Sequence, residues 1–316
     1  MRITVLAGGV GAARFLRGLK AAAPDAEITV IGNTGDDITL AGLRVCPDLD
    51  TVMYTLGGGI SEEQGWGRDG ESRVVLGELA AYGAGPDWFG LGDKDFATHI
   101  LRTEILASGG TLSEATRRLC ARWQPGVRLL PMSDDPVRTH VTVDLDGREQ
   151  VLHFQEWWVR LRAAVPARSI EAVGVATAAA APGVLEAIAD ADFVLFPPSN
   201  PVVSIGPILA VPGIGDAVMA KTVVGVSPII GGAPVRGMAD ACLAAIGVQT
   251  SAVAVAAHYG PGLLSGWLVD DQDKEAVDDP ELSGIVVQAR PLYMTSVAAA
   301  ADIAQAAVDL AVRVTR

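Results

Sequence analysis

Two clusters of aspartate lie close together near the start of the chain, and carboxylates in this arrangement can bind a divalent cation. Asp36 and Asp37 follow the apolar run at 28–31, and Asp48 and Asp50 come shortly afterwards. Magnesium prefers oxygen ligands and commonly takes one or two carboxylates together with substrate phosphate and water. Four acids this close would repel one another unless a cation or a bound proton offsets their charge. Helix capping is the alternative for Asp48 or Asp50 taken singly.

A glycine turn near the amino terminus can bind phosphate. Gly8, Gly9 and Gly11 stand between the apolar run at 3–6 and a helical pattern, and the free N–H groups at the start of a helix attract anions. No Gly-Lys-Ser/Thr follows, so the turn is not a P-loop, and Arg14 occupies the place of the third glycine of a dinucleotide fingerprint. A tight turn between two buried elements is the alternative. Beside the acid clusters, the turn favours a metal–diphosphate substrate.

The stretch at 90–103 reads as the start of a helix that carries acidic and basic side chains. Its acidic residues suit the first turn of a helix. Lys94, His99 and Arg102 follow, and His99 and Arg102 stand three residues apart on one helical face. A lone histidine is more often structural than catalytic. We therefore regard Lys94 and Arg102 as stronger candidates for ligand contact than His99.

Polar and aromatic residues also follow later apolar runs. Ser199 and Asn200 lie in a proline-rich turn after an apolar run. A similar turn spans residues 227–236, and the guanidinium of Arg236 at its end is a candidate phosphate partner. A rigid turn without a ligand is the alternative for the first segment. The adjacent Trp157 and Trp158 can stack on a flat ring or pack the interior, and we favour packing.

The elements that must position these residues alternate between strand and helix. Apolar runs at 3–6 and 28–31 flank a helical face, and this βαβ order predicts a parallel sheet with a right-handed crossover. We predict an α/β fold, Rossmann-like and doubly wound, with a mostly parallel sheet. Further strands are expected at 172–176, 193–196, 223–226 and 252–256, and helices at 182–189, 239–246 and around 303–314.

The middle of the chain has a different pattern. Segments 72–82, 95–107 and 112–123 read as helices, and the strands at 139–145 and 150–155 flank Asp146-Gly147, a hairpin signal. We predict a core domain of residues 1–60 and 165–316, with residues 61–164 inserted as a smaller, largely helical lobe. Ligands are expected in the cleft at the carboxyl ends of the parallel strands.

The composition excludes several classes of partner. The 316 residues contain 24 Lys and Arg against 37 Asp and Glu, a net charge of −13. Nucleic acid and anionic membranes need a positive surface, so neither is an expected partner. The three cysteines are scattered, and neither a signal peptide nor a membrane-spanning apolar stretch is evident. We expect a cytoplasmic protein with reduced thiols.

Taken together, the motifs resemble those of the CofD/FbiA family of transferases, which act in the synthesis of the deazaflavin coenzyme F-420. The resemblance runs nearly end to end, and HFQEWWVR and RWQPGVRLLP look like the actinobacterial branch. The specific pieces are LAGGVGAARFL, NTGDD, CPDLDTVMYTLGGG, WFGLGDKDFATHILRT, PPSNPVVSIGPIL and SPIIGGAPVRGMAD.

The resemblance implies a reaction. A guanosine diphosphate that carries a three-carbon acid on its terminal phosphate would donate that phospho-acid group to the ribityl hydroxyl of the deazaflavin precursor Fo, and GMP would leave. The acid is lactate in archaeal members and enolpyruvate in actinobacterial ones, and the actinobacterial motifs favour enolpyruvate here. Magnesium is implied as the cofactor, and a homodimer is the expected assembly.

The resemblance also implies roles for individual residues. Asp36 and Asp48 match the metal-binding acids, and Asp50 matches the acid at the Fo hydroxyl. Lys94 matches a basic position near Fo, where it replaces a commoner arginine and loses the planar fork. The inserted lobe would contribute to the Fo site. Thr51 of the core domain and His99 of the lobe are further candidates for contact with Fo. The expected nucleotide- and phosphate-binding residues are Gly8, Gly9, Gly11, Arg14, Asn33, Ser199, Asn200 and Arg236.

Two other functions are alternatives to the transferase. YvcK-like proteins, which bind nucleotide sugars without catalysis, share the glycine loop and the general fold, but PDLDT and GLGDKDFATH belong with Fo handling. An NAD-dependent oxidoreductase is disfavoured by the broken fingerprint. It is also disfavoured by Asn33, because an acid is expected at the end of the second strand.

Overall fold

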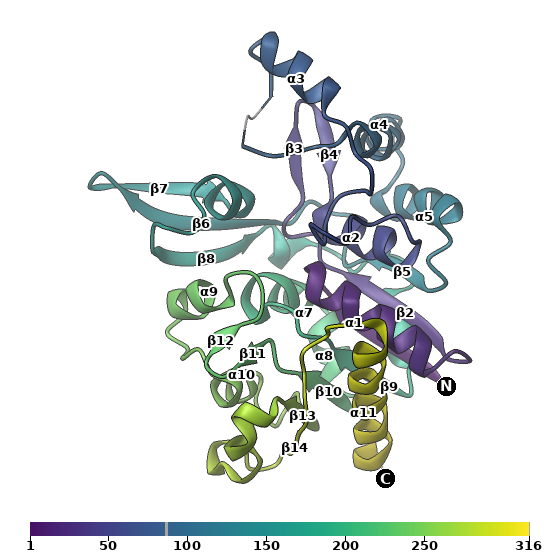
Figure 1. The fold of residues 1–316 in the computed structure, drawn as a ribbon, viewed down its shortest axis with the longest axis vertical. Helices are drawn as coiled ribbons and strands as arrows, with labels where there is room; N and C mark the ends of the chain where they lie inside the picture. Colours follow the sequence, from purple (N-terminus) through teal and green to yellow (C-terminus); the bar gives the residue numbers. More distant parts are fainter. Residues whose placement is uncertain (86–87, 316) are drawn as a thin grey trace.

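A seven-stranded sheet forms the centre of the computed structural model, which describes residues 1–85 and 88–315 (Figure 1). The strand order is β14-β13-β10-β9-β1-β2-β5, and every neighbouring pair is parallel. This confirms the α/β fold with a doubly wound parallel sheet. The strands are β1 (Arg2–Ala7), β2 (Glu27–Gly32), β5 (Arg128–Pro131), β9 (Phe193–Phe196), β10 (Val223–Val226), β13 (Gly266–Val269) and β14 (Val286–Ala289).

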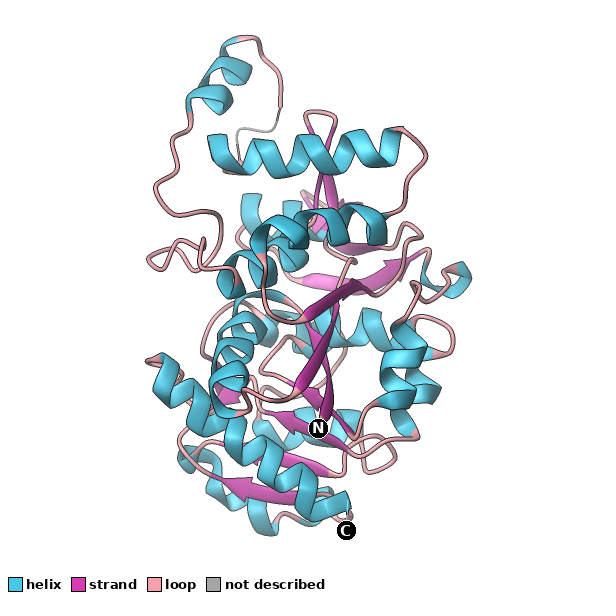
Figure 2. Cartoon of the chain, turned by 90° about the vertical axis from the view of Figure 1, so that its right-hand side faces the viewer, coloured by secondary structure: helices cyan, strands magenta, loops and turns pink. Residues whose placement is uncertain are grey.

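The sheet is covered by helices on both faces, as Figure 2 shows. The central strands β1, β2, β9, β10 and β13 are almost entirely buried, as expected for parallel strands packed on both sides. One core contains apolar side chains of α1 (Gly9–Ala22), α2 (Pro47–Leu56), α5 (Leu112–Trp123) and α11 (Val297–Thr315). The other contains those of α6 (Val184–Asp190), α7 (Gly206–Ala210), α8 (Ile214–Met219), α9 (Ala239–Ala245) and α10 (Ala252–Tyr259).

Smaller elements extend from the carboxyl ends of the strands. A three-stranded antiparallel sheet has the order β7-β6-β8, and its hairpin turns at Asp146-Gly147 as predicted. The helices predicted in the middle of the chain are confirmed as α3 (Val74–Ala81), α4 (Asp93–Ala107) and α5. The remaining strands are β3 (Ile38–Leu40), β4 (Leu43–Val45), β6 (Arg138–Leu145), β7 (Arg148–His153), β8 (Ala167–Val173), β11 (Ile229–Ile230) and β12 (Ala233–Pro234). The short helical turns are η1 (Glu156–Arg160), η2 (Val175–Thr177), η3 (Pro201–Ile205), η4 (Asp271–Asp278) and η5 (Pro280–Leu282).

Two predicted strands of the central sheet were wrong. The run at 252–256 forms α10, because the Ser251 hydroxyl caps the helix by accepting a hydrogen bond from the Ala254 N–H at 3.0 Å. A short apolar run does not distinguish a buried helix from a buried strand, and here the cap decides. The run at 172–176 overlaps the end of β8, which pairs antiparallel with β6 outside the central sheet. The strand β5 joins the central sheet although it lies within 61–164, and the division into two domains stays a prediction.

The close packing of α1 on α11 depends on a glycine, and this gives a testable prediction. A Cβ on Gly18 would collide with the backbone of Ala300 and would lie 2.6 Å from the Ala301 nitrogen. We expect Gly18→Ala to lower the free energy of unfolding by about 2–3 kcal/mol in urea titrations. Gly77 on α3 is the matched control, since no atom of the described residues lies within 4 Å of a Cβ there, and Gly77→Ala should stabilise by about 0.5–1 kcal/mol. Equal stability of Gly18→Ala and the unmodified chain would contradict this packing.

Among the described residues, no helix has both the length and the apolar character needed to span a bilayer.

Candidate active site

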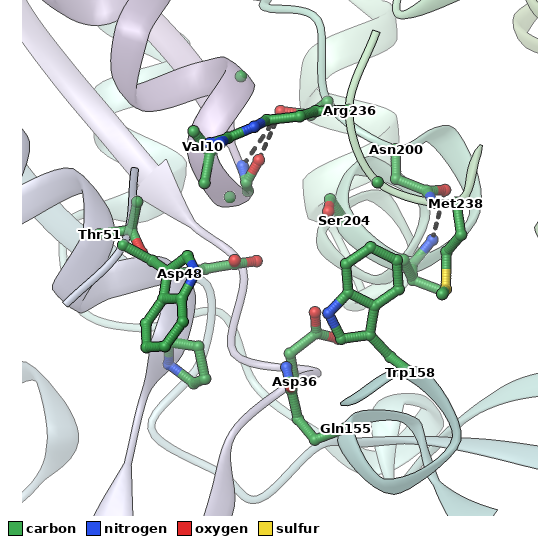
Figure 3. Close-up of a pocket in the computed structure, with 18 of the residues that line it drawn as sticks. Val10, Asp36, Asp48, Thr51, Gln155, Trp158, Asn200, Ser204, Arg236 and Met238 are labelled. Carbon is green, nitrogen blue, oxygen red and sulfur yellow. Dashed lines mark hydrogen bonds between the residues drawn. The ribbon is translucent and has the colours of Figure 1, made fainter. Parts of the chain in front are cut away.

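A cavity of about 500 Å³ opens at the carboxyl ends of the central strands (Figure 3). The loops after β1, β9 and β10 meet there, at the place where the strand order changes direction between β1 and β9. Such switch points are the usual ligand sites of doubly wound sheets. Of the predicted site residues, the lining includes Gly8, Gly9, Gly11, Asp36, Asp48, Thr51, Ser199, Asn200 and Arg236. It does not include Arg14, Asn33, Asp50, Lys94 or His99.

The glycine turn comes so close to neighbouring loops that side chains do not fit. A Cβ on Gly8 would collide with Ser204, and one on Gly11 would collide with the Pro198 carbonyl oxygen. The Ser199 hydroxyl donates to the Gly8 carbonyl at 2.8 Å and accepts from the Gly8 N–H at 3.3 Å. Ser199 therefore joins the loops after β1 and β9. These contacts keep the start of α1 at the cavity wall, where its N–H groups can meet an anion.

Asn200 and Asn33 are held by bonds within the protein. The Asn200 side-chain oxygen accepts from the backbone N–H groups of Val202 and Val203, so it caps η3. The Asn33 amide donates to Asp48 Oδ2 at 2.9 Å and to the Val203 carbonyl at 3.1 Å. Asn33 lies behind the cavity wall and orients one of its carboxylates. The predicted contacts of both residues with nucleotide stay predictions.

Asp36 and Asp48 form an acidic pair on the cavity wall. Both are buried, and Asp36 Oδ1 has no hydrogen-bond partner among the described residues. Burial raises the pKa of Asp36 well above its ordinary value, and the charges of Asp48 and Asp37 raise it further. Burial also raises the pKa of Asp48 to about 7, opposed by the hydrogen bond from Asn33. Two carboxylates that are this unfavourable as bare anions fit a position beside a cation.

The donor set at this pair fits a cation that also binds substrate oxygen. Within residues 1–85 and 88–315, no group of three or more His, Cys, Asp or Glu side chains is arranged to hold a metal ion. Magnesium needs fewer protein ligands, since it keeps water and takes substrate phosphate alongside one or two carboxylates. Asp36 and Asp48, beside the glycine turn, match that requirement.

Asp50 faces away from the cavity, against α4. Its carboxylate pairs with the guanidinium of Arg102, which is only 1% exposed, and Arg102 Nη1 lies 3.1 Å from Asp50 Oδ2. His99 Nδ1 is 3.8 Å from the same oxygen. The helical repeat explains the difference, because Asp48 and Thr51 lie three residues apart on one face of α2 whereas Asp50 is on the other side. Asp50, His99 and Arg102 thus come together beside the cavity and not on its wall.

Lys94 and His99 stand apart from each other on α4. Lys94 is exposed, and its ammonium donates to the Asp69 carbonyl at 2.6 Å. Burial lowers the pKa of His99 to about 4 although the Asp50 charge opposes this, so the ring is neutral at pH 7. Its Nε2 has no partner in the described part of the chain. Neither side chain reaches the cavity lining.

The buried carboxyl of Asp95, beside the Asp50 charge, predicts a stability that depends on pH. Burial, followed by the charge of Asp50, raises the pKa of Asp95 from 3.8 to about 7. A carboxyl whose folded-state pKa is raised contributes stability below its unfolded pKa and loses that contribution as the pH rises through the folded value. We expect Asp95→Asn to stabilise the protein by roughly 2–4 kcal/mol at pH 8 and to change little at pH 4. Urea unfolding at both pH values checks this. A gain at pH 4 as large as that at pH 8 would contradict it.

Comparisons with known proteins show the family of this chain. A family model described as 2-phospho-L-lactate transferase CofD matches residues 3–292. The chain belongs to the CofD family.

Several curated relatives of this CofD-family chain are named phosphoenolpyruvate transferase. Proteins named phosphoenolpyruvate transferase are 67% identical over 313 residues in Streptomyces griseus and 66% identical over 319 residues in Thermobifida fusca, each covering 98% of both chains. A protein of the same name from Mycobacterium sp. strain KMS is 52% identical over 333 residues, which cover 98% of this chain and 99% of that one. These matches confirm the family resemblance and show that the protein is a transferase.

Solved structures show the same fold at low identity. Two crystal structures of a Bacillus halodurans protein, described as a member of the UPF0052 family, match with a TM-score of 0.63 and 19% identity. The match covers 97% of this chain and 98% or 99% of theirs. At this identity the likeness supports the architecture alone.

The cavity of this CofD-family chain also contains residues that the sequence motifs did not single out as ligand-binding. Of the tryptophan pair, Trp157 is fully buried and donates its indole N–H to the Val165 carbonyl at 2.7 Å, so packing is confirmed for it. Trp158 lines the cavity instead. The pair itself was the available signal, but only the structure separates its members. The other unpredicted lining residues include Val10, Trp66, Phe89, Phe154, Gln155, Ser204 and Met238.

Proposed function

We propose that the protein transfers a phosphoenolpyruvyl group from a guanosine-diphosphate-activated donor to the ribityl hydroxyl of Fo and releases GMP, a step of coenzyme F-420 biosynthesis. Membership of the CofD family and the similarity to proteins named phosphoenolpyruvate transferase support this assignment. The observation that carries it is the placement of the buried pair Asp36 and Asp48 beside the glycine turn in one cavity. A 2-phospho-L-lactyl donor is the variant of the same reaction.

The reaction is a direct displacement at phosphorus. The Fo hydroxyl oxygen forms a bond to the terminal phosphorus of the diphosphate, and the bond from that phosphorus to the bridging oxygen breaks. GMP leaves with the bridging oxygen and its electron pair, and the hydroxyl proton passes to a base. Such a transfer needs an in-line approach and stabilised phosphoryl charge more than it needs a covalent enzyme intermediate.

The residues of the cavity divide these tasks. N–H groups at the start of α1 would contact the diphosphate. Gly8 and Gly11 allow this, because without side chains the turn can pack closely against the neighbouring loops. Asp36 and Asp48 would hold Mg²⁺, which when bound offsets negative charge on the transferring phosphoryl group. Arg236 is the basic side chain among the lining residues, and its fixed charge suits a second phosphate or the carboxylate of the donor.

Asp50, the acid that the family resemblance puts at the Fo hydroxyl, is proposed to orient that hydroxyl or to accept its proton. Its carboxylate is bound to Arg102, but each carboxylate oxygen has two lone pairs, so acceptor capacity remains. Because Asp50 faces Arg102, contact with the Fo hydroxyl requires its side chain to turn toward the cavity, past Thr51, which lines the cavity one residue further along α2. Lys94 would contact Fo from the start of α4 after release from the Asp69 carbonyl.

Mass spectrometry of the product tests the proposal. The protein is incubated with Fo, Mg²⁺ and each donor in turn, and the phosphoenolpyruvyl and phospholactyl products differ by two hydrogens. Formation of the dehydro product with release of GMP is the expected result. Absence of both products, with nucleotide sugars bound and Fo ignored in titrations, would identify a regulator and overturn the assignment. The expected homodimer stays a prediction, which light scattering in solution would check.

A further inference from the structure

The cavity has a flat aromatic side chain at the end away from α2. Trp158 comes from the π-helical turn η1 and lines the cavity, and its ring lies nearly parallel to Phe154, at 14° with 6.5 Å between centroids. Short π-helical segments are frequent at functional sites. Trp158 is half-buried, unlike its neighbour Trp157, so part of its ring remains accessible to a ligand.

A polar side chain accompanies this ring. Gln155 is only 7% exposed and lines the same cavity. It immediately precedes η1, yet its side chain does not cap that turn. A glutamine amide offers two N–H donors and one carbonyl acceptor in a plane. Pockets for nucleobases combine stacking on aromatic or apolar side chains with hydrogen bonds to the edge of the base.

The two ends of the cavity are separated by the acidic pair. Figure 3 shows Thr51 of α2 on one side and Trp158 on the other, with Asp48 and Asp36 between them. In an in-line displacement, the entering hydroxyl and the leaving oxygen lie on opposite sides of the phosphorus. The acceptor and the leaving nucleotide must therefore extend in opposite directions from the acidic pair.

We infer that Trp158 stacks on the purine ring of the leaving nucleotide and that Gln155 hydrogen-bonds the edge of that base. The inference rests on the proposed function, which assigns the α2 end of the cavity to the deazaflavin. Both side chains are binding and positioning residues, since neither touches the reacting phosphorus. They supply the base recognition that no local sequence motif revealed.

Calorimetric titration tests the inference without relying on turnover. The full chain is titrated with GMP and, separately, with Fo, each with Mg²⁺ present. Base–aromatic stacking is worth about 1–3 kcal/mol per base, so Trp158→Ala should weaken GMP binding on the order of tenfold or more. Trp158→Phe keeps a flat ring and should stay within about threefold of the unmodified chain. Fo binding should be unchanged in both variants.

Trp66, a second tryptophan of the cavity lining, provides the matched control. It lines the cavity and lies 3.8 Å from the position of a Cβ on Gly90, in the loop before α4. Trp66→Ala should leave GMP binding within about twofold. Unchanged GMP affinity in Trp158→Ala, or a loss of Fo affinity instead, would overturn the inference while leaving the proposed function intact. If the unmodified chain bound neither GMP nor Fo, the proposed function itself would fail.

Discussion

Asp48→Asn should abolish most transfer activity while making the protein more stable. The carboxylate lies in the cavity beside Asp36, and we propose that it holds the cation facing the diphosphate. Loss of one such electrostatic contact is expected to lower kcat by about two to three orders of magnitude. Steady-state rates of GMP release with Fo and saturating donor provide the measurement.

The gain in stability follows from the raised pKa of the same group. Burial raises the pKa of Asp48 to about 7. At pH 8 this carboxyl is therefore ionised in the metal-free folded protein although burial disfavours its charge, and the free energy of unfolding is lower than it is below the raised pKa. Asparagine removes that charge with little change in shape, and the free energy of unfolding should rise by about 1–3 kcal/mol. Opposite changes in activity and stability are typical of residues selected for function.

The exposed Asp309 on α11 provides the control for charge removal. Its carboxylate accepts a hydrogen bond from Gln305 at the surface, and Asp309 is not one of the residues that line the cavity. Asp309→Asn should change neither kcat nor stability beyond about 0.5 kcal/mol. If Asp48→Asn retained activity within a fewfold of the unmodified chain, Asp48 would have no part in the transfer.

Arg102→Met should be among the most destabilising substitutions in the protein. Arg102 of α4 is buried, and its guanidinium donates to Asp50 of α2 and to the Arg44 carbonyl. Its removal leaves the Asp50 carboxylate buried without its partner, near a second acid, Asp95. Breaking a buried ion pair on one side typically costs about 3–5 kcal/mol. Urea unfolding followed by circular dichroism measures this loss.

A double variant separates lost charge pairing from lost packing. Asp50→Asn combined with Arg102→Met removes both charges, so it should recover most of the stability lost in the single variant. Arg168 supplies the exposed comparison, because its pairs with Asp144 and Glu149 lie at the surface. Arg168→Met should cost less than about 1 kcal/mol. An Arg102→Met loss no larger than the Arg168→Met loss would show that the Asp50 contact does not hold α2 to α4.

The same contact tests the proposed role of Asp50 in catalysis. If Asp50 takes the proton from Fo, Asp50→Asn should depress kcat far more than donor KM, since the donor touches other residues. An equal effect on both parameters would instead indicate that Asp50 only fixes the position of α2. The structure makes this distinction necessary, because Asp50 is bound to Arg102 behind the cavity wall.

Several elements were predictable because their signals are local. The apolar runs of β1, β2, β9 and β10, the glycine turn after β1 and the Asp146-Gly147 hairpin were all recognisable from neighbouring residues. Segment 252–256 was not, since its strand-like composition is overridden by a helix cap at Ser251. The pairing of β8 with β6 depends on contacts between segments distant in the chain, which local composition does not reveal.

By itself, the sequence determined the parallel α/β architecture, the CofD family and the residue types of the site, because each depends on short motifs in a constant order. The tertiary structure decided which of those residues share a cavity. The helical repeat of α2 turns Asp48 and Thr51 toward it and Asp50 toward Arg102, and η1 buries Trp157 while leaving Trp158 on the wall. Side-chain direction depends on how helices pack against distant elements, and neighbouring letters in a motif do not record it.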